Sequence, residues 1–319
     1  MTCMHRGVFR KGLISDMRQT QCPVCSLAPN AEEQELSLIL CSRCGVTWTL
    51  ILREVDTAAL YADEVYAVVD NRDSAFEKII MREAGSVLKQ ARRLLAPGAN
   101  RLLDFGCGKG QFLYRAAQEG WVVSGVETAP ERAEFARNCY GVAVQEGLYT
   151  DGKLDGEGYD LITLNHVLEH LPQPVALLDR LLVNNLADGG VVMLEVPRLD
   201  SWQSRLAGRR WMHLDFPKHL THWTHDTLAS KMNEIGYEVI GQRRFSVHLG
   251  VLGMLQALAS RTGFNDNIIV ALKHRRTLPL MARIAMLLPL AFALEVLAIP
   301  FGRTGILGFF LQKSPAKAQ

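Results

Sequence analysis

Short apolar runs that alternate with helical stretches constrain the fold of this chain more than any other feature of its sequence. Four such runs, three of them followed by a helical stretch, lie at residues 101–105, 121–126, 159–164 and 190–196. Apolar runs separated by helices are typical of parallel strands that are buried on both faces. The sequence therefore predicts an α/β fold with a central parallel sheet. Residues 237–245 and 305–312 are predicted to be further strands.

The first run leads into a glycine-rich loop, DFGCGKG at 104–110, and then into a helix. Glycine permits positive φ angles and a close approach of a ligand to the main chain, and a helix N-terminus offers free N–H groups. The second run ends at Glu127, where an acid would hold the hydroxyls of a ribose. A tight turn without a ligand would also need glycine, and Glu127 alone could be a solvated acid. The order of strand, glycine loop, helix and a second strand that ends in an acid favours a ribose-containing ligand.

Four segments together resemble the motifs of the class I S-adenosylmethionine-dependent methyltransferases, in the order in which that family carries them. They are LLDFGCGKG, GVE, YDLITLNHVLEHLPQP and GGVVMLEVP, and the resemblance covers about residues 85–246. It implies a Rossmann-like seven-stranded sheet with helices on both faces and an antiparallel last strand. It also implies S-adenosyl-L-methionine as the cofactor. In such an in-line transfer the protein mainly supplies orientation, which is worth about 7–11 kcal/mol.

The resemblance also implies roles for single residues. Glu127 would take the ribose hydroxyls, and Asn165 would line the floor beneath the sulfonium. In the same motif, His166 and Glu169 would fix the loop, and His170 would be structural. The loop near the methionine part of the cofactor would contain Asp104, Gly106, Gly108 and Gly110.

Two CxxC pairs near the N-terminus predict a metal site. Cys22 and Cys25 form the first pair, and Cys41 and Cys44 form the second after 15 intervening residues. This spacing is typical of a four-thiolate zinc ribbon, in which the closed coordination shell makes the zinc structural. No apolar stretch of signal-peptide length stands at the N-terminus, so we expect a reducing cytoplasm without disulfides. The alternatives are a ribbon that has lost its metal and a redox pair.

A zinc ribbon before a class I methyltransferase resembles the sugar C-methyltransferases that act on nucleotide-linked deoxysugars. Those carry a Tyr-His-Glu-His motif after the fifth strand, and the matching stretch here is 216–219, which puts His219 on the family's base position. Phe216 stands where that family has the tyrosine, and this chain is shorter than the chains of that family's members. Zinc-ribbon methyltransferases of surface-glycan and lipid pathways are therefore a closer fit. The surrounding segment 197–223, rich in Trp and His, is predicted to be a lid; the alternative is an aromatic roof over a core.

The predicted function is methylation of a small-molecule, sugar or lipid-linked acceptor, with O-methylation first and His219 as the catalytic base. The alternatives are a nucleotide-sugar C-methyltransferase, a zinc-ribbon rRNA methyltransferase and a cofactor-binding module without turnover. A formal net charge of +2 argues against a DNA-binding protein. Residues 21–55 contain only Arg43 and Arg53 as basic residues, which also argues against RNA.

The charge is distributed unevenly along the chain. Residues 1–240 hold 25 Lys+Arg and 31 Asp+Glu, whereas residues 241–319 hold 10 and 2. The basic part includes the apolar segment 248–303, which lies between the last two predicted strands and contains the basic cluster 273–276. Its late charge-free stretch, 284–294, has 11 residues and is interrupted by Pro289, whereas a spanning helix needs about 20. We expect attachment to a membrane surface without crossing; the alternative is a buried helical subdomain or dimer interface.

These observations divide the chain into five predicted regions, in a protein of the cytoplasm or of the inner face of its membrane. Besides the helical stretches after the apolar runs, two further helices are predicted within the core region, at 74–95 and after a cap at Thr224. The regions are a mobile leader at 1–20, a zinc ribbon at 21–55, a methyltransferase core at 74–247, an apolar helical insertion at 248–303, and the last core strand with the tail at 304–319.

Overall fold

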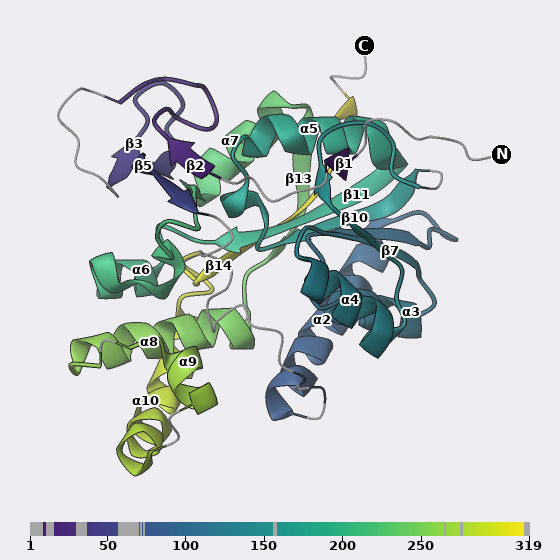
Figure 1. The fold of residues 1–319 in the computed structure, drawn as a ribbon. Coiled ribbons are helices and arrows are strands. Elements are labelled where there is room, and N and C mark those ends of the chain that lie inside the picture. The colour runs from purple at the N-terminus through teal and green to yellow at the C-terminus, as the bar shows by residue number, and fades with distance from the viewer. Residues whose placement is uncertain are drawn as a thin grey trace.

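A seven-stranded sheet forms the centre of the computed structural model, which describes residues 9–10, 16–29, 37–56, 70, 72, 74–155, 158–264, 266–274 and 277–315 (Figure 1). The strand order is β13-β14-β11-β10-β6-β7-β8. Neighbouring strands are parallel except β14, which is antiparallel to both β11 and β13. The predicted α/β sheet with an antiparallel last strand is therefore confirmed. Its strands are β6 (Arg101–Phe105), β7 (Val122–Glu127), β8 (Val144–Glu146), β10 (Tyr159–Asn165), β11 (Leu186–Pro197), β13 (Tyr237–Arg243) and β14 (Ile306–Lys313).

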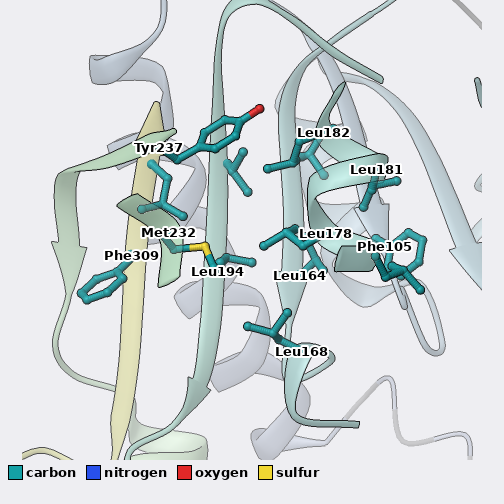
Figure 2. Packing of buried hydrophobic residues seen from close by; sticks show 14 of the residues in the cluster. Phe105, Leu164, Leu168, Leu178, Leu181, Leu182, Leu194, Met232, Tyr237 and Phe309 are labelled. Atoms are coloured by element: carbon teal, nitrogen blue, oxygen red, sulfur yellow. The ribbon is translucent and has the colours of Figure 1, made fainter. Parts of the chain in front are cut away.

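Helices cover both faces of this sheet, as the sequence predicted. Successive residues of a strand point to opposite faces. Leu102 thus packs with α2 (Ala75–Leu94), α3 (Gln111–Gln118) and α4 (Pro130–Tyr140). Its neighbour Leu103 belongs to the other cluster, with α5 (Pro174–Asn185) and α7 (His225–Glu234), part of which Figure 2 shows. Each fully buried aliphatic side chain in these layers contributes about 1.5–3 kcal/mol.

The helix boundaries follow from capping side chains. The Ser74 hydroxyl accepts a hydrogen bond from the Glu77 N–H at 3.0 Å, and the Thr224 hydroxyl accepts one from the Thr227 N–H at 3.2 Å. Both predicted helices are confirmed at these caps. The edge strand β8 was not predicted, because three residues are too few to form an apolar run.

The cysteine-rich segment forms small antiparallel sheets that are separate from the central sheet. Strands β3 (Leu38–Leu40) and β4 (Thr47–Thr49) pair, and β2 (Asp16–Gln19) pairs with β5 (Ile51–Asp56). β1 (Phe9–Arg10) pairs with β9 (Leu148–Tyr149). Strands β1 and β2 lie within residues 1–20, where a mobile leader was expected. Their partners, β9 and β5, lie far away in the sequence, so no local pattern indicated these pairings. Residues 1–8 and 11–15 lie outside the described residues.

The segment between β11 and α7 is folded into short elements. It contains α6 (Trp202–Ala207) and the 3₁₀ turns η2 (Gly208–Arg210) and η3 (Met212–Leu214). The strand β12 (Thr221–His222) follows and joins β4 in a sheet of order β12-β4-β3. An earlier 3₁₀ turn, η1 (Leu168–His170), follows β10.

The apolar insertion consists of helices, and one of them overturns a prediction. After η4 (Val247–Val251) come α8 (Leu252–Arg261), α9 (Ile268–His274) and α10 (Leu278–Leu297). α10 continues through Pro289 for 20 residues, so the expected break at this proline was wrong. An interior proline removes a hydrogen-bond donor and crowds the carbonyl of the preceding turn, but α10 packs against α8 on both sides of Pro289, which stabilises the helix there. By length and composition α10 could cross a membrane, because an 18-residue window of it has a mean hydropathy of 2.0, with 22% of that window buried.

Candidate active site

The glycine loop connects β6 to α3 with three positive φ angles, +75° at Gly106, +55° at Gly108 and +83° at Gly110. A Cβ atom at Gly106 would lie 2.5 Å from Val167 Cγ2, so this glycine is required by close packing. At Gly108, a Cβ atom would meet nothing within 4 Å. The main chain at Gly108 therefore borders open space that a ligand could occupy.

Glu127, the last residue of β7, lies against this loop and is 5% exposed. One of its oxygens accepts a hydrogen bond from the Gly108 N–H at 2.8 Å, and the other accepts one from the Ala129 N–H at 2.8 Å. A carboxylate has about four acceptor positions, so Glu127 retains capacity for further donors.

Asp104 and Asn165 lie side by side at the ends of two neighbouring strands, β6 and β10. Asp104 Oδ1 accepts hydrogen bonds from the Thr163 hydroxyl at 2.6 Å and from Asn165 Nδ2 at 3.4 Å. Burial raises the pKa of Asp104 to about 7, although the two hydrogen bonds act in the opposite direction. The structure thus brings the expected loop acid and the expected floor residue together.

A buried network of charged side chains starts directly after Asn165. His166 lies between two carboxylates, with Nε2 at 3.2 Å from Glu195 and Nδ1 at 3.3 Å from Glu169. Burial alone would lower the pKa of His166, but these carboxylates raise it to about 9. The second oxygen of Glu195 pairs with Arg243. Both nitrogens of His166 therefore face carboxylates, and the charged imidazole fixes the loop after β10.

The outer members of this network were missed by the sequence analysis. Arg243 also pairs with Glu83 of α2 at 2.7 Å, and Glu83 lies 2.5 Å from His248 Nδ1. Glu195 could have been noticed, because it is the only charged residue in the apolar run GGVVMLEVP. Glu83 and Arg243 carry no comparable signal, since charged residues on a helix and near a strand end are common.

His219 is 6% exposed and packs against the segment after β10. The Leu220 N–H donates to the Glu169 carbonyl at 2.7 Å, and the rings of His219 and His170 are 4.6 Å apart. Its Nδ1 lies 2.8 Å from the His213 carbonyl, so the proton of a neutral ring resides on Nδ1 and Nε2 has the lone pair. Burial lowers the pKa of His219 well below its usual value, and His170 and His222 lower it further.

The cysteine-rich segment supports this histidine directly. The Thr49 hydroxyl donates to the His219 carbonyl at 2.7 Å and lies 2.9 Å from His222 Nε2. Trp211 and Trp223 are 3% and 0% exposed. These two tryptophans of the segment 197–223 are therefore packed inside the protein, as in an aromatic roof over a core, and the lid stays a prediction.

Among the described residues, two groups of side chains could hold a metal ion. The sulfur atoms of Cys22, Cys25, Cys41 and Cys44 all lie within 4.8 Å of one another, with 3.5 Å between Cys22 and Cys44 and 3.4 Å between Cys25 and Cys41. Four thiolates at about 2.3 Å from a central zinc require a similarly small spacing. The second group comprises Glu169, His170 and His219, whose potential ligand atoms also lie within 4.8 Å of one another.

Comparisons with known proteins agree with this geometry. A family model described as a methyltransferase domain matches residues 64–242, more than half of the chain. The ubiquinone biosynthesis O-methyltransferase of Xanthomonas campestris pv. campestris (strain B100) is 34% identical over 110 residues, which are 33% of this chain and 45% of that protein. The enzyme of the same name from Histophilus somni (strain 2336) is 24% identical over 160 residues, 43% of this chain and 67% of that protein.

A further relative acts on a sugar. The dTDP-4-amino-2,3,4,6-tetradeoxy-D-glucose N,N-dimethyltransferase of Saccharopolyspora spinosa is 33% identical over 144 residues, 44% of this chain and 57% of that protein. The chain thus spans about half to two thirds of the length of these relatives. Among solved structures, coclaurine N-methyltransferase bound to N-methylheliamine and SAH has a TM-score of 0.46 and 16% identity, covering 77% of this chain and 75% of that one.

Proposed function

Because this chain belongs to the S-adenosylmethionine-dependent methyltransferases, we propose that it methylates a hydroxyl group of a small-molecule acceptor and that His219 takes the proton. The neutral, buried His219 next to the segment after β10 is the observation that carries this proposal. A base that is held neutral at physiological pH has its lone pair available for a hydroxyl proton. Positioned bases of this kind contribute typically about 10²–10⁴-fold to the rate.

The proposed cofactor site is the space along the glycine loop. When bound, S-adenosyl-L-methionine supplies an activated methyl group. The open main chain at Gly108 and the remaining acceptor capacity of Glu127 fit a ribose-containing molecule. Asp104, Gly106 and Gly110 would complete this loop, and Asn165, held by Asp104, would form the floor beneath the reacting end.

Two relatives support a hydroxyl acceptor, because their names describe O-methyltransferases. The third relative is named as an N,N-dimethyltransferase of an amino sugar, so methyl transfer to an amino group is the second candidate. A neutral imidazole favours the hydroxyl, since an amine attacks through its own lone pair and needs no base in the displacement itself.

We further propose that the four cysteines hold one structural zinc ion in a reducing cytoplasm. Their mutual spacing fits a tetrahedral site, and four thiolates leave no position for a substrate. The zinc would organise β3 and β4, and β4 carries the Thr49 hydroxyl that holds His219 in place. Its proposed role is therefore to support the base.

Transfer of an isotope-labelled methyl group from S-adenosyl-L-methionine tests the proposal. The full chain is incubated with separate fractions of polar small molecules, nucleotide sugars and membrane lipids. NMR of the labelled product then identifies a methyl ether, an N-methyl group or a C-methyl group. The proposal fails if the methyl group resides on nitrogen or carbon, or if His219→Ala retains the turnover of the matched variant His225→Ala.

A further inference from the structure

Within the insertion between β13 and β14, all exposed side chains of residues 278–301 are apolar. Within this range the only charged residues are Arg283, which is partly buried, and Glu295, which is buried. Nine of the fourteen large apolar side chains that are exposed in the described residues lie here. Contiguous apolar surfaces of this kind mark interaction sites. We call residues 278–301 the α10 surface; its most exposed members are Leu278, Met286, Leu297 and Phe301.

The opposite side of α10 packs on the protein. Leu287 and Ala291 are 8% and 0% exposed and belong to a core cluster with Val251, Met254 and Leu255. A helix that is apolar all round is normally buried in a protein or in lipid. Since one side of α10 is already covered by α8, a single face remains to be covered.

Polar contacts hold α10 against the body of the molecule. Glu295 accepts a hydrogen bond from the Gly305 N–H at 2.6 Å, directly before β14. Gln203 of α6 donates to the Gly250 carbonyl at 3.1 Å and thereby fixes the start of the same insertion. Crossing a bilayer would separate α10 from α8 and break the hydrogen bond of Glu295. The geometry therefore favours an orientation along a surface.

The basic composition of the segment that carries the α10 surface indicates the kind of partner. Residues 241–319 hold 10 Lys+Arg and 2 Asp+Glu. Of these two acids, Glu295 is buried and Asp266 is exposed. An apolar face in a basic segment of the chain matches the acyl chains and the anionic headgroups of a membrane surface. We propose that the α10 surface docks in the plane of an anionic lipid bilayer, with the apolar side chains inserted to the depth of the headgroup boundary.

This docking places the candidate active site near the bilayer. α8 contacts both α6 and η3, which belong to the segment that carries His219. Figure 1 shows α8 and α10 on the same side of the molecule as α6. If the proposed function is correct, the acceptor is an amphiphilic molecule taken from this surface. The docking itself does not depend on methyl transfer, so its test uses binding alone.

Sedimentation of the full chain with vesicles tests the docking. Vesicles of phosphatidylcholine with phosphatidylglycerol are compared with phosphatidylcholine alone, each at low and high salt. We expect binding to the anionic vesicles that weakens with salt. The double variant Met286→Glu, Leu290→Glu should bind at least about tenfold more weakly, because it places charge on the inserted face. The matched variant Val122→Glu, Val183→Glu changes two exposed apolar residues elsewhere and should bind like the unaltered chain.

Binding of S-adenosyl-L-methionine verifies that each variant is folded. A second measurement avoids charged variants altogether. Trp202 lies 5.4 Å from Phe301 at the border of the α10 surface, so brominated acyl chains should quench its fluorescence, and Trp202→Phe should remove this quenching. The proposal is overturned if the chain ignores anionic vesicles, or if the Met286→Glu, Leu290→Glu variant binds them equally well. It is also overturned if the α10 surface is covered by a second copy, seen as a dimer that this variant dissociates.

Discussion

The two halves of the central sheet are built in different ways. The proposed cofactor half comprises β6, β7 and β8, and all its proposed polar groups except Asn165 of β10 lie between Asp104 and Glu127 in the sequence. The acceptor half comprises β10, β11, β13 and β14, and its polar groups come from elements as distant as β4 and β13. A local motif thus forms the first half, whereas the second depends on long-range packing. A substitution in the first half should therefore change the affinity for the cofactor, whereas a substitution in the second half should change turnover and leave that affinity unaltered.

Loss of the metal should have the largest effect and should remain in the acceptor half. Cys41→Ser is expected to abolish zinc binding and turnover, because structural zinc contributes an apparent free energy of about 10–16 kcal/mol to such small folds. The affinity for S-adenosyl-L-methionine should stay unchanged, since no ribbon strand belongs to the cofactor half. Metal analysis, calorimetry and turnover measure the three quantities, with Cys139→Ser as the matched control. A simultaneous loss of cofactor binding would contradict the separation.

Removal of the proposed base should act on the chemical step alone. His219→Ala is expected to lower kcat by about 10²–10⁴-fold, as is typical for a positioned base. The dissociation constant of the cofactor should not change, because His219 contacts the segment after β10 and not the glycine loop. Steady-state kinetics on the identified acceptor checks this. Equal turnover of His219→Ala and His225→Ala would show that another group takes the proton from the acceptor.

Replacement of Glu127, the acid at the end of β7, should act on the proposed cofactor half. Glu127→Gln is expected to weaken S-adenosyl-L-methionine binding by about 1.5–3 kcal/mol, which is roughly 10–150-fold, because a charge-assisted acceptor is lost. The KM of the acceptor should remain the same. Calorimetry on Glu127→Gln and on the exposed neighbour Glu131→Gln gives the comparison. Unchanged affinity would show that Glu127 does not hold the ribose.

The smallest expected effect is a pH dependence of cofactor binding. Burial raises the pKa of Asp104 to about 7, so this carboxyl is increasingly protonated and neutral below that pH. The cationic cofactor favours the ionised form, and binding should therefore weaken by up to about tenfold from about pH 8 to about pH 6. His166, with a pKa of about 9, stays charged in this range. Asp104→Asn should give a flat profile; a persisting slope would place the titration elsewhere.

Much of the cofactor half could be predicted from the sequence. A glycine with positive φ and an acid at a strand end leave a local signature, because the residues that meet are also near one another in the chain. The alternation of apolar runs and helices likewise predicted the layers of the sheet. The spacing of the four cysteines indicated a common site, since two CxxC turns can close on one another with little constraint from the rest of the chain.

Only the tertiary structure decided the acceptor half. The pairing of β12 with β4 places Thr49 beneath His219, and the two residues are 170 positions apart. Glu195 and Arg243 meet because both are paired with Gly308 of β14, the strand between theirs. The continuity of α10 through Pro289 likewise depends on packing against α8. The sequence by itself determined the contacts that local backbone geometry enforces. Contacts between distant segments depend on the free energy of packing the whole chain, which no local pattern contains.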